Sequence, residues 1–142
     1  MNATVDYCAI TKKAIDDIIK QISSASAFPM VIEDSDNIWK VYTKQKNASL
    51  TIDKTDKDNI VFTIVSKSDN CNTSTKYTVK LNDCNSLTLW YFYRYLEDAK
   101  NLLAMSYLFG IEVWPLTISI NTAIQEVLEP LVLEPLVHRK NI

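Results

Sequence analysis

Glycine is almost absent from this chain of 142 residues, which has only one, Gly110. Phosphate-binding loops of the P-loop and dinucleotide-binding kinds need several glycines, because their backbone must approach the phosphates closely. The sequence therefore excludes nucleotide binding of those forms. Turns must be made by asparagine and aspartate, eleven of each, since these residues tolerate positive φ and hydrogen-bond their own backbone.

Histidine is equally scarce. His138 is the only one and lies five residues from the C-terminal end of the sequence, counting itself. A serine or cysteine nucleophile would have no other imidazole to act as its base. We therefore expect no catalytic residues, and the sequence predicts a protein that is not an enzyme.

Paired carboxylates occur at Asp34 with Asp36, at Asp56 with Asp58, and at Glu97 with Asp98. The first two pairs lie in predicted turns, and neither has the glycine or distal glutamate of a calcium loop. Glu97 and Asp98 would be the best acid–base candidates if their helix face lined a cleft, but a solvated ionic stripe explains them as well. We expect no metal and no cofactor.

Cysteine is limited to Cys8, Cys71 and Cys84, an odd number without metal-ligand spacing. The first residues show no basic and apolar signal segment. These features predict a reducing compartment, cytoplasmic location and three small, buried or half-buried thiols. A bridge between Cys71 and Cys84 is the alternative that the spacing leaves open.

Charge of one sign does not dominate, since the formal net charge is −2. The distribution is uneven, because residues 38–80 carry eight lysines against four aspartates, whereas residues 97–136 carry six acids and one lysine. Arginine is missing from the basic part, and no aromatic single-strand-binding motif occurs there. The sequence argues against nucleic acid as a partner.

Residues 86–109 form the stretch around which the chain is organised. Apolar residues recur at steps of three and four and predict one buried face of a helix: Leu89, Phe92, Leu96, Ala99 and Leu103. Asn85 or Ser86 can cap its start, and Gly110 is the expected C-cap. Four charges between Arg94 and Lys100 oppose a membrane span, so we expect a buried helix of a water-soluble protein.

Two further patterns precede this helix. Residues 5–24 have an isoleucine-rich face and a charged face, which predicts an amphipathic helix capped by Thr4. The following residues alternate and predict five strands at 28–33, 38–44, 48–54, 60–67 and 75–81. No connection is long enough for a helical crossover, so the strands should form an antiparallel meander.

Alternation within the strands predicts which side chains face the core. We expect the following residues to point inward: Trp39, Val41, Leu50, Ile52, Tyr77, Val79 and Leu81. The fourth strand has apolar residues on both sides, which favours a central position or a cover on its second face. The other face of the sheet should be in water.

Beyond Gly110 we expect an extended passage over 111–115 and a short helix over 122–128, capped by Ser119 or Asn121 and interrupted by Pro130. The sequence Leu128–Val132 is repeated directly at residues 133–137. The repeat either extends the last helix as kinked turns on the core or forms an apolar contact strip for a partner.

The expected fold is therefore α+β, in one domain over 1–142: an N-terminal helix, a five-stranded antiparallel meander, a long aromatic central helix and a short C-terminal helix. Residues 128–142 form a C-terminal apolar repeat and tail interrupted by proline. Small proteins with this order of elements include secretion chaperones, toxin-immunity proteins and viral inhibitors, which is an analogy of architecture only.

The central helix has more rings than one buried face needs. We therefore expect an intracellular, non-enzymatic protein-binding module of the inhibitor, immunity or chaperone type, a bacterial or viral accessory protein that occupies its partner's surface as a homodimer. The predicted partner-binding residues are Trp90, Tyr91, Tyr95, Leu131, Val132, Leu133, Leu136 and Val137. The alternative is an apolar-ligand cup lined by Trp39, Tyr77, Trp90 and Tyr93.

Overall fold

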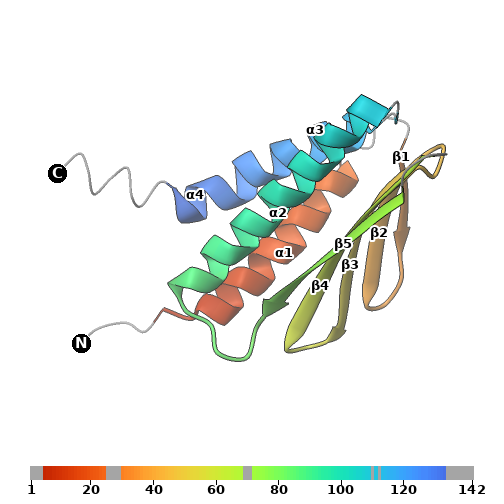
Figure 1. Cartoon of the computed structure of the whole chain (residues 1–142). Helices are drawn as coiled ribbons and strands as arrows, with labels where there is room; N and C mark the ends of the chain where they lie inside the picture. The colour runs from red at the N-terminus through yellow and green to blue at the C-terminus, as the bar shows by residue number, and fades with distance from the viewer. Residues whose placement is uncertain (1–4, 25–29, 69–71, 110, 112, 134–142) are drawn as a thin grey trace.

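The computed structural model describes residues 5–24, 30–68, 72–109, 111 and 113–133. One antiparallel sheet is covered by helices on one face (Figure 1). The elements follow in the order α1 (Tyr7–Ser24), β1 (Met30–Asp34), β2 (Ile38–Thr43), β3 (Ala48–Asp56), β4 (Asn59–Lys67), β5 (Asn72–Lys80), α2 (Ser86–Ser106), η1 (Tyr107–Phe109), α3 (Trp114–Ala123), η2 (Ile124–Leu128) and α4 (Glu129–Val132). The predicted α+β architecture is confirmed.

The five strands form the predicted meander, in the spatial order β1-β2-β3-β4-β5. The inward residues predicted on β2 and β3 are buried, and so is Val79 on β5, whereas Tyr77 is half-buried. β4 lies between β3 and β5, which agrees with its apolar residues on both faces. Among the described residues other than glycine, only Lys46 has positive φ, at 61°, although we expected asparagine or aspartate in that role.

The isoleucine-rich face of α1 packs on the sheet through Ile15, Ile18 and Ile22. The carboxylate of Asp6 accepts a hydrogen bond from the N–H of Ala9 at 3.0 Å and so caps the first turn. The predicted cap, Thr4, lies outside the described residues.

Asn85 caps α2, which settles the choice between Asn85 and Ser86. Its side-chain oxygen accepts from the N–H of Leu87 at 2.8 Å, and the Thr88 hydroxyl accepts from the N–H of Asn85 at 3.1 Å. All five residues of the predicted face are buried. Within the described ranges no helix is long and apolar enough to span a membrane. α2 ends at Ser106 with Tyr107 as its C-cap, which corrects the expected C-cap Gly110; Gly110 itself lies outside the described ranges.

The third helix begins earlier than predicted, at Trp114 rather than Thr122. Pro115 explains the error, because proline at the first helical positions needs no hydrogen-bond partner for its nitrogen and already has helical φ. We had interpreted it as part of an extended passage. The predicted caps, Ser119 and Asn121, both lie inside the helix.

Pro130 does not interrupt the last helix, contrary to the prediction. The turn before it is a π-helix, η2, in which the N–H of Glu129 bonds to the carbonyl of Ile124 five residues earlier. A proline ring clashes with the carbonyl four residues before it, and the wider turn accommodates the ring. The first copy of the repeat is therefore helical, and of the second copy only Leu133 is described.

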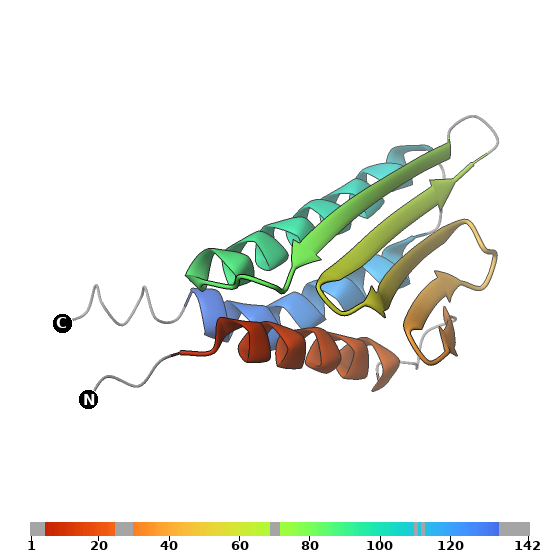
Figure 2. The ribbon, with the colours of Figure 1, turned by 90° about the horizontal axis from the view of Figure 1, so that it is seen from below.

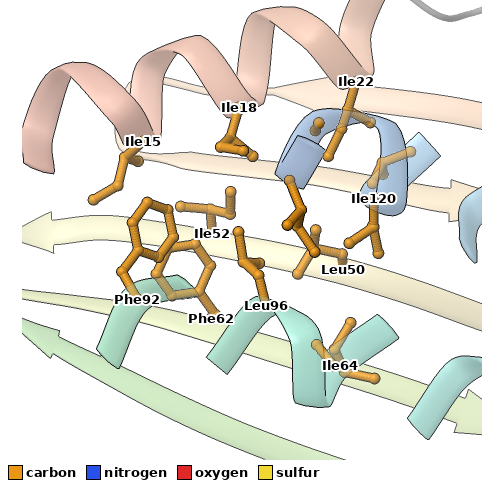
Figure 3. Packing of buried hydrophobic residues seen from close by; sticks show 14 of the residues in the cluster. Ile15, Ile18, Ile22, Leu50, Ile52, Phe62, Ile64, Phe92, Leu96 and Ile120 are labelled. Atoms are coloured by element: carbon orange, nitrogen blue, oxygen red, sulfur yellow. The ribbon is translucent and has the colours of Figure 1, made fainter. Parts of the chain in front are cut away.

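The core lies between the sheet and the helices, and the rod α3–η2–α4 runs alongside both α1 and α2 (Figure 2). At its centre the rings of Phe62 on β4 and Phe92 on α2 stack with centroids 5.1 Å apart (Figure 3). Ile15 of α1 and Ile52 of β3 lie beside these rings, and the same cluster continues away from them through Ile22, Ile120 and Leu50. Helices and sheet thus share one continuous apolar core.

Cys8 and Cys84 form a disulfide with their Cα atoms 5.2 Å apart. This corrects the prediction of three unpaired thiols and also the alternative bridge from Cys84 to Cys71. Cys71 lies outside the described residues. The bridge fastens the first turn of α1 to the loop between β5 and α2, and Cys8 Sγ lies 3.0 Å from the carbonyl oxygen of Leu81 in that loop.

Candidate functional site

Aromatic side chains occupy two flanks of α2, and on the flank beside the C-terminal rod Tyr93 is half-buried whereas Trp90 is 38 % exposed. On that flank Trp90 stacks on Tyr93 with centroids 5.7 Å apart. Tyr93 is half-buried against the core, and its burial, together with the charges of Glu97 and then Glu129 on α4, raises its pKa. Part of the aromatic surplus is therefore covered within the chain.

The second flank carries three stacked rings, which we name the tyrosine ladder: Tyr77 of β5 with Tyr95 and Tyr91 of α2. The centroids of Tyr77 and Tyr95 are 5.2 Å apart, and those of Tyr95 and Tyr91 are 6.2 Å apart. Burial and the nearby charge of Asp98 raise the pKa of Tyr77. Tyr91 at the outer end is 52 % exposed, so the ladder runs from the half-buried sheet edge into solvent.

A groove of about 310 Å³ lies between β5 and the start of α2. We name it the strand–helix groove, and its lining is Thr78, Val79, Lys80, Asp83, Asn85, Leu87, Thr88, Tyr91 and Tyr95. Leu87, on the helix side of the groove, is 54 % exposed. The groove therefore combines Leu87 and the tyrosine rings of the helix with polar residues, among them Lys80 of the strand and Asp83 of the loop.

β5 is an edge strand with β4 as its only neighbour, and it lies next to α2 (Figure 1). The N–H of Leu81 donates to the carbonyl of Asp58 at 2.7 Å. In an antiparallel strand pair, residues that hydrogen-bond to the neighbouring strand alternate with residues that do not. The N–H and C=O groups of Ser74, Lys76 and Thr78 therefore point away from β4. Within the described part of the chain, these groups have no hydrogen-bond partner.

Lysine side chains mark the outer face of this edge. Lys76 and Lys80 are exposed and lie opposite Thr63 and Asn59 of β4. Among the described residues, no carboxylate lies within ion-pair distance of either lysine. The edge thus presents positive charge on one face and tyrosine rings on the other.

The predicted partner-binding residues divide between two places. Trp90, Tyr91 and Tyr95 lie on α2, whereas Leu131, Val132 and Leu133 lie at the end of the C-terminal rod. Leu131 is 39 % exposed and Val132 packs against the core. Leu136 and Val137 lie outside the described residues.

A second groove, of about 740 Å³, runs between α1 and the end of the rod. Val127, Pro130 and Leu131 line it on the rod side. Its α1 side is mostly polar, and a Lys13–Asp17 ion pair with a 2.9 Å contact lies there.

Of the four residues of the alternative ligand cup, Trp90 and Tyr93 stack on each other, whereas Trp39 and Tyr77 lie apart. Trp39 is 1 % exposed on β2, and its indole N–H donates to the hydroxyl of Ser23 at 3.2 Å. Tyr77 is on β5, so β3 and β4 lie between them. Between Trp39 and Tyr77, the stacked rings of Phe62 and Phe92 fill the space between the sheet and the helices. Trp39 is a core residue.

Glu97 forms an ion pair within α2 with Lys100, and Lys100 in turn links α2 to α3. Lys100 Nζ donates to Glu97 Oε2 at 2.8 Å and to Asn121 Oδ1 of α3 at 3.2 Å. Both charged side chains are about one-fifth exposed, at 19 % and 21 %. Asp98 faces solvent. Across the ranges that the structure describes, no three histidine, cysteine or acidic side chains gather as a metal site would require.

Sequence reasoning missed the strand side of the groove, which is formed by Thr78 and Lys80, and its rim residue Leu87. The signal was present, because the last strand of a meander is always an edge strand. Alternation also places Lys76, Thr78 and Lys80 on the face opposite the core.

The fold and the groove define a class of structure: an α+β domain whose one-sided antiparallel sheet ends in an open strand beside an aromatic helix. Comparison of the chain with protein-family models, curated proteins and solved structures gives no match.

Proposed function

We propose that this chain is a non-enzymatic protein-binding module that occupies a surface of its partner through the strand–helix groove and the tyrosine ladder. The observation that carries the proposal is the open β5 edge next to the exposed ring of Tyr91. Tyrosine is enriched at protein interfaces because it supplies a large contact area at low cost in conformational entropy, with a polar tip that tolerates water. The proposal includes inhibitor, immunity and chaperone-type roles, each of which requires the chain to occupy a surface of its partner.

A capture experiment with the full chain tests this proposal. Leu87→Ala with Tyr91→Ala removes two side chains of the groove that are 54 % and 52 % exposed. The matched control is Met105→Ala with Tyr107→Ala, at the last turn of α2 and the start of η1, where the side chains are 57 % and 67 % exposed. We expect the first double variant to capture at least about tenfold less partner from source cells, and the control to capture as much as the unaltered chain. Equal capture by both variants would contradict the proposal.

We also propose that the chain is a homodimer through the exposed Leu131 and the groove between α1 and the rod. The expected mass in sedimentation is twice the 16.2 kDa of one chain. Leu131→Ala should shift the mass to that of one chain, because it removes the exposed apolar side chain on which the contact depends. A single-chain mass for the unaltered protein at high concentration would exclude the dimer.

Cytoplasmic location remains a prediction. It was argued from first residues without a signal segment and from three unpaired cysteines, and the second argument has changed. The thiol argument assumed three unpaired cysteines, whereas Cys8 and Cys84 are bridged. Disulfides persist mainly in oxidising compartments. Alkylation of free thiols in intact cells would test the prediction: a reduced Cys8–Cys84 pair supports a cytoplasmic location, and an oxidised pair contradicts it.

A further inference from the structure

We infer that the open edge of β5 accepts an extended segment of the partner as a sixth strand, and that this segment alternates apolar with acidic side chains. The inference rests on the proposed function and adds the mode of binding and the chemistry of the bound segment. Strand addition beside a helix is a general way to bind peptides, since the backbone supplies affinity and alternate side chains supply specificity.

The backbone of β5 is suited to strand addition. Its nine residues contain no proline, and the N–H and C=O groups of Ser74, Lys76 and Thr78 point away from β4. Edge strands are normally protected by shortness, proline, bulges or charged side chains, lysine above all. Of these, β5 carries the lysines Lys76 and Lys80, which repel a like-charged strand and leave an acidic one favoured. β1, the other edge, has only five residues and carries Glu33 and Asp34. β5 is thus the longer edge and the one without acids.

The helix side of β5 selects apolar side chains. A strand paired with β5 would place every second side chain on the face that carries Tyr77 and Val79. On that face the incoming side chains meet the strand–helix groove and the rings of Tyr91 and Tyr95. A groove of about 310 Å³ suits individual side chains of a peptide rather than a large compact ligand.

The opposite side of β5 selects acids. The remaining side chains of the incoming strand would lie beside Ser74, Lys76, Thr78 and Lys80. Opposite charges directly across a strand pair are stabilising and like charges are destabilising. Because the described residues leave both lysines without a carboxylate partner, glutamate or aspartate fits these positions.

A second copy of the chain fits this edge less well. Two β5 strands related by a two-fold axis at Lys76 would place the two copies of this lysine opposite each other. Moving the axis by one residue, to Thr75 or Tyr77, places Lys76 opposite Ser74 or Thr78 of the other copy. No such register supplies an acid, so the charge pattern favours a different, acidic strand.

Titration of the full-length chain with a synthetic nine-residue peptide that alternates glutamate with valine and phenylalanine tests the inference. Thr78→Pro removes one outward N–H, which an edge strand tolerates, and Thr78→Val keeps it as the matched control. We expect the peptide to bind the unaltered chain and Thr78→Val equally, and to bind Thr78→Pro at least about tenfold more weakly. A peptide with lysine in place of glutamate should bind at least about tenfold more weakly to all three proteins.

A peptide N-methylated at the amides that face β5 gives a second readout that does not depend on the folding of a variant. It should lose binding, because it cannot donate to the strand edge. The inference is overturned if the unmodified peptide does not bind at about millimolar concentration. Equal binding to Thr78→Pro and Thr78→Val, or a dimer of the unaltered chain that Thr78→Pro dissociates, also overturns it.

Failure of this inference and failure of the proposed function give different results. If Thr78→Pro captures the cellular partner as well as Thr78→Val does, while Leu87→Ala with Tyr91→Ala loses it, strand addition is wrong and the binding surface stands. If all these variants keep the partner, the proposed function is wrong for this surface.

Discussion

The ring of Tyr77 on β5 stacks on the ring of Tyr95 on α2, with centroids 5.2 Å apart and planes inclined by 27°. This contact joins the last strand of the sheet to the central helix at the side where no further strand follows. It therefore fixes the spacing of the two walls of the strand–helix groove. Tyr91 extends the stack beyond the sheet and leaves a ring available to a partner.

A double-mutant cycle tests this stack. Tyr77→Leu and Tyr95→Leu keep an apolar side chain and remove the ring, and each should lower the free energy of unfolding. We expect a coupling of about 0.5–1.5 kcal/mol between them in urea unfolding, the range measured for aromatic pairs. Tyr95→Leu with Tyr107→Leu is the control and should be additive within about 0.5 kcal/mol. Additive effects for the first pair would mean that the rings do not stabilise each other.

Removal of the disulfide should destabilise the chain. Cys8→Ser with Cys84→Ser opens a loop that spans 76 positions in the sequence, and we expect a loss of about 2–4 kcal/mol in the free energy of unfolding. A reducing agent should have the same effect on the unaltered chain and none on the double variant. Cys71→Ser, outside the bridge, should keep the response to reductant. An unaltered chain whose stability is the same with and without reductant would contradict this bridge.

The sequence predicted most of the fold because its signals are local. Alternation located all five strands, and their short connections allowed only a meander. The steps of three and four residues identified the buried face of α2, from Leu89 to Leu103. The sequence also predicted that α2 has rings beyond those needed for the core.

The errors arose where the structure depends on distant or compensating contacts. Cys8 and Cys84 are 76 positions apart, so nothing near either residue indicates the pair. Pro115 and Pro130 suggested interruption, but one lies in the first turn of α3 and the other follows a π-helical turn. Alternation predicts correctly that Trp39 faces the core, but it gives only the face of a strand, and β3 and β4 separate Trp39 from Tyr77, which the cup would need beside it.

The cap of α2 should contribute measurably to stability. Asn85→Ala removes the side-chain acceptor for the N–H of Leu87, and we expect it to lower the free energy of unfolding by about 1 kcal/mol. Ser86→Ala is the neighbouring control and should change it by less than about 0.5 kcal/mol, because Asn85 is the cap. Thermal or urea unfolding measures both. A larger loss for Ser86→Ala than for Asn85→Ala would contradict this assignment of the cap.

Stability should fall in strongly alkaline solution. Burial raises the pKa of Tyr77 and of Tyr93, and nearby acids add to the shift. Since the neutral phenol is favoured in the folded state, this stabilisation is complete below the unfolded pKa of about 10 and is lost as pH rises through the folded pKa. Tyr77→Phe with Tyr93→Phe should flatten this fall in the free energy of unfolding. Urea unfolding at several pH values measures it. Ultraviolet titration that shows both phenols ionising below pH of about 10 would contradict the direction of the shift.

The central claim is that the partner covers the open edge of β5. Amide-resolved hydrogen exchange on the free chain, and on the chain bound to the partner captured from source cells, tests it most directly. We predict that the outward amides of Lys76 and Thr78 exchange at least about tenfold more slowly in the complex, because they become hydrogen-bonded to the partner. Unchanged exchange at these two amides, with protection gained elsewhere on the chain, would contradict the claim.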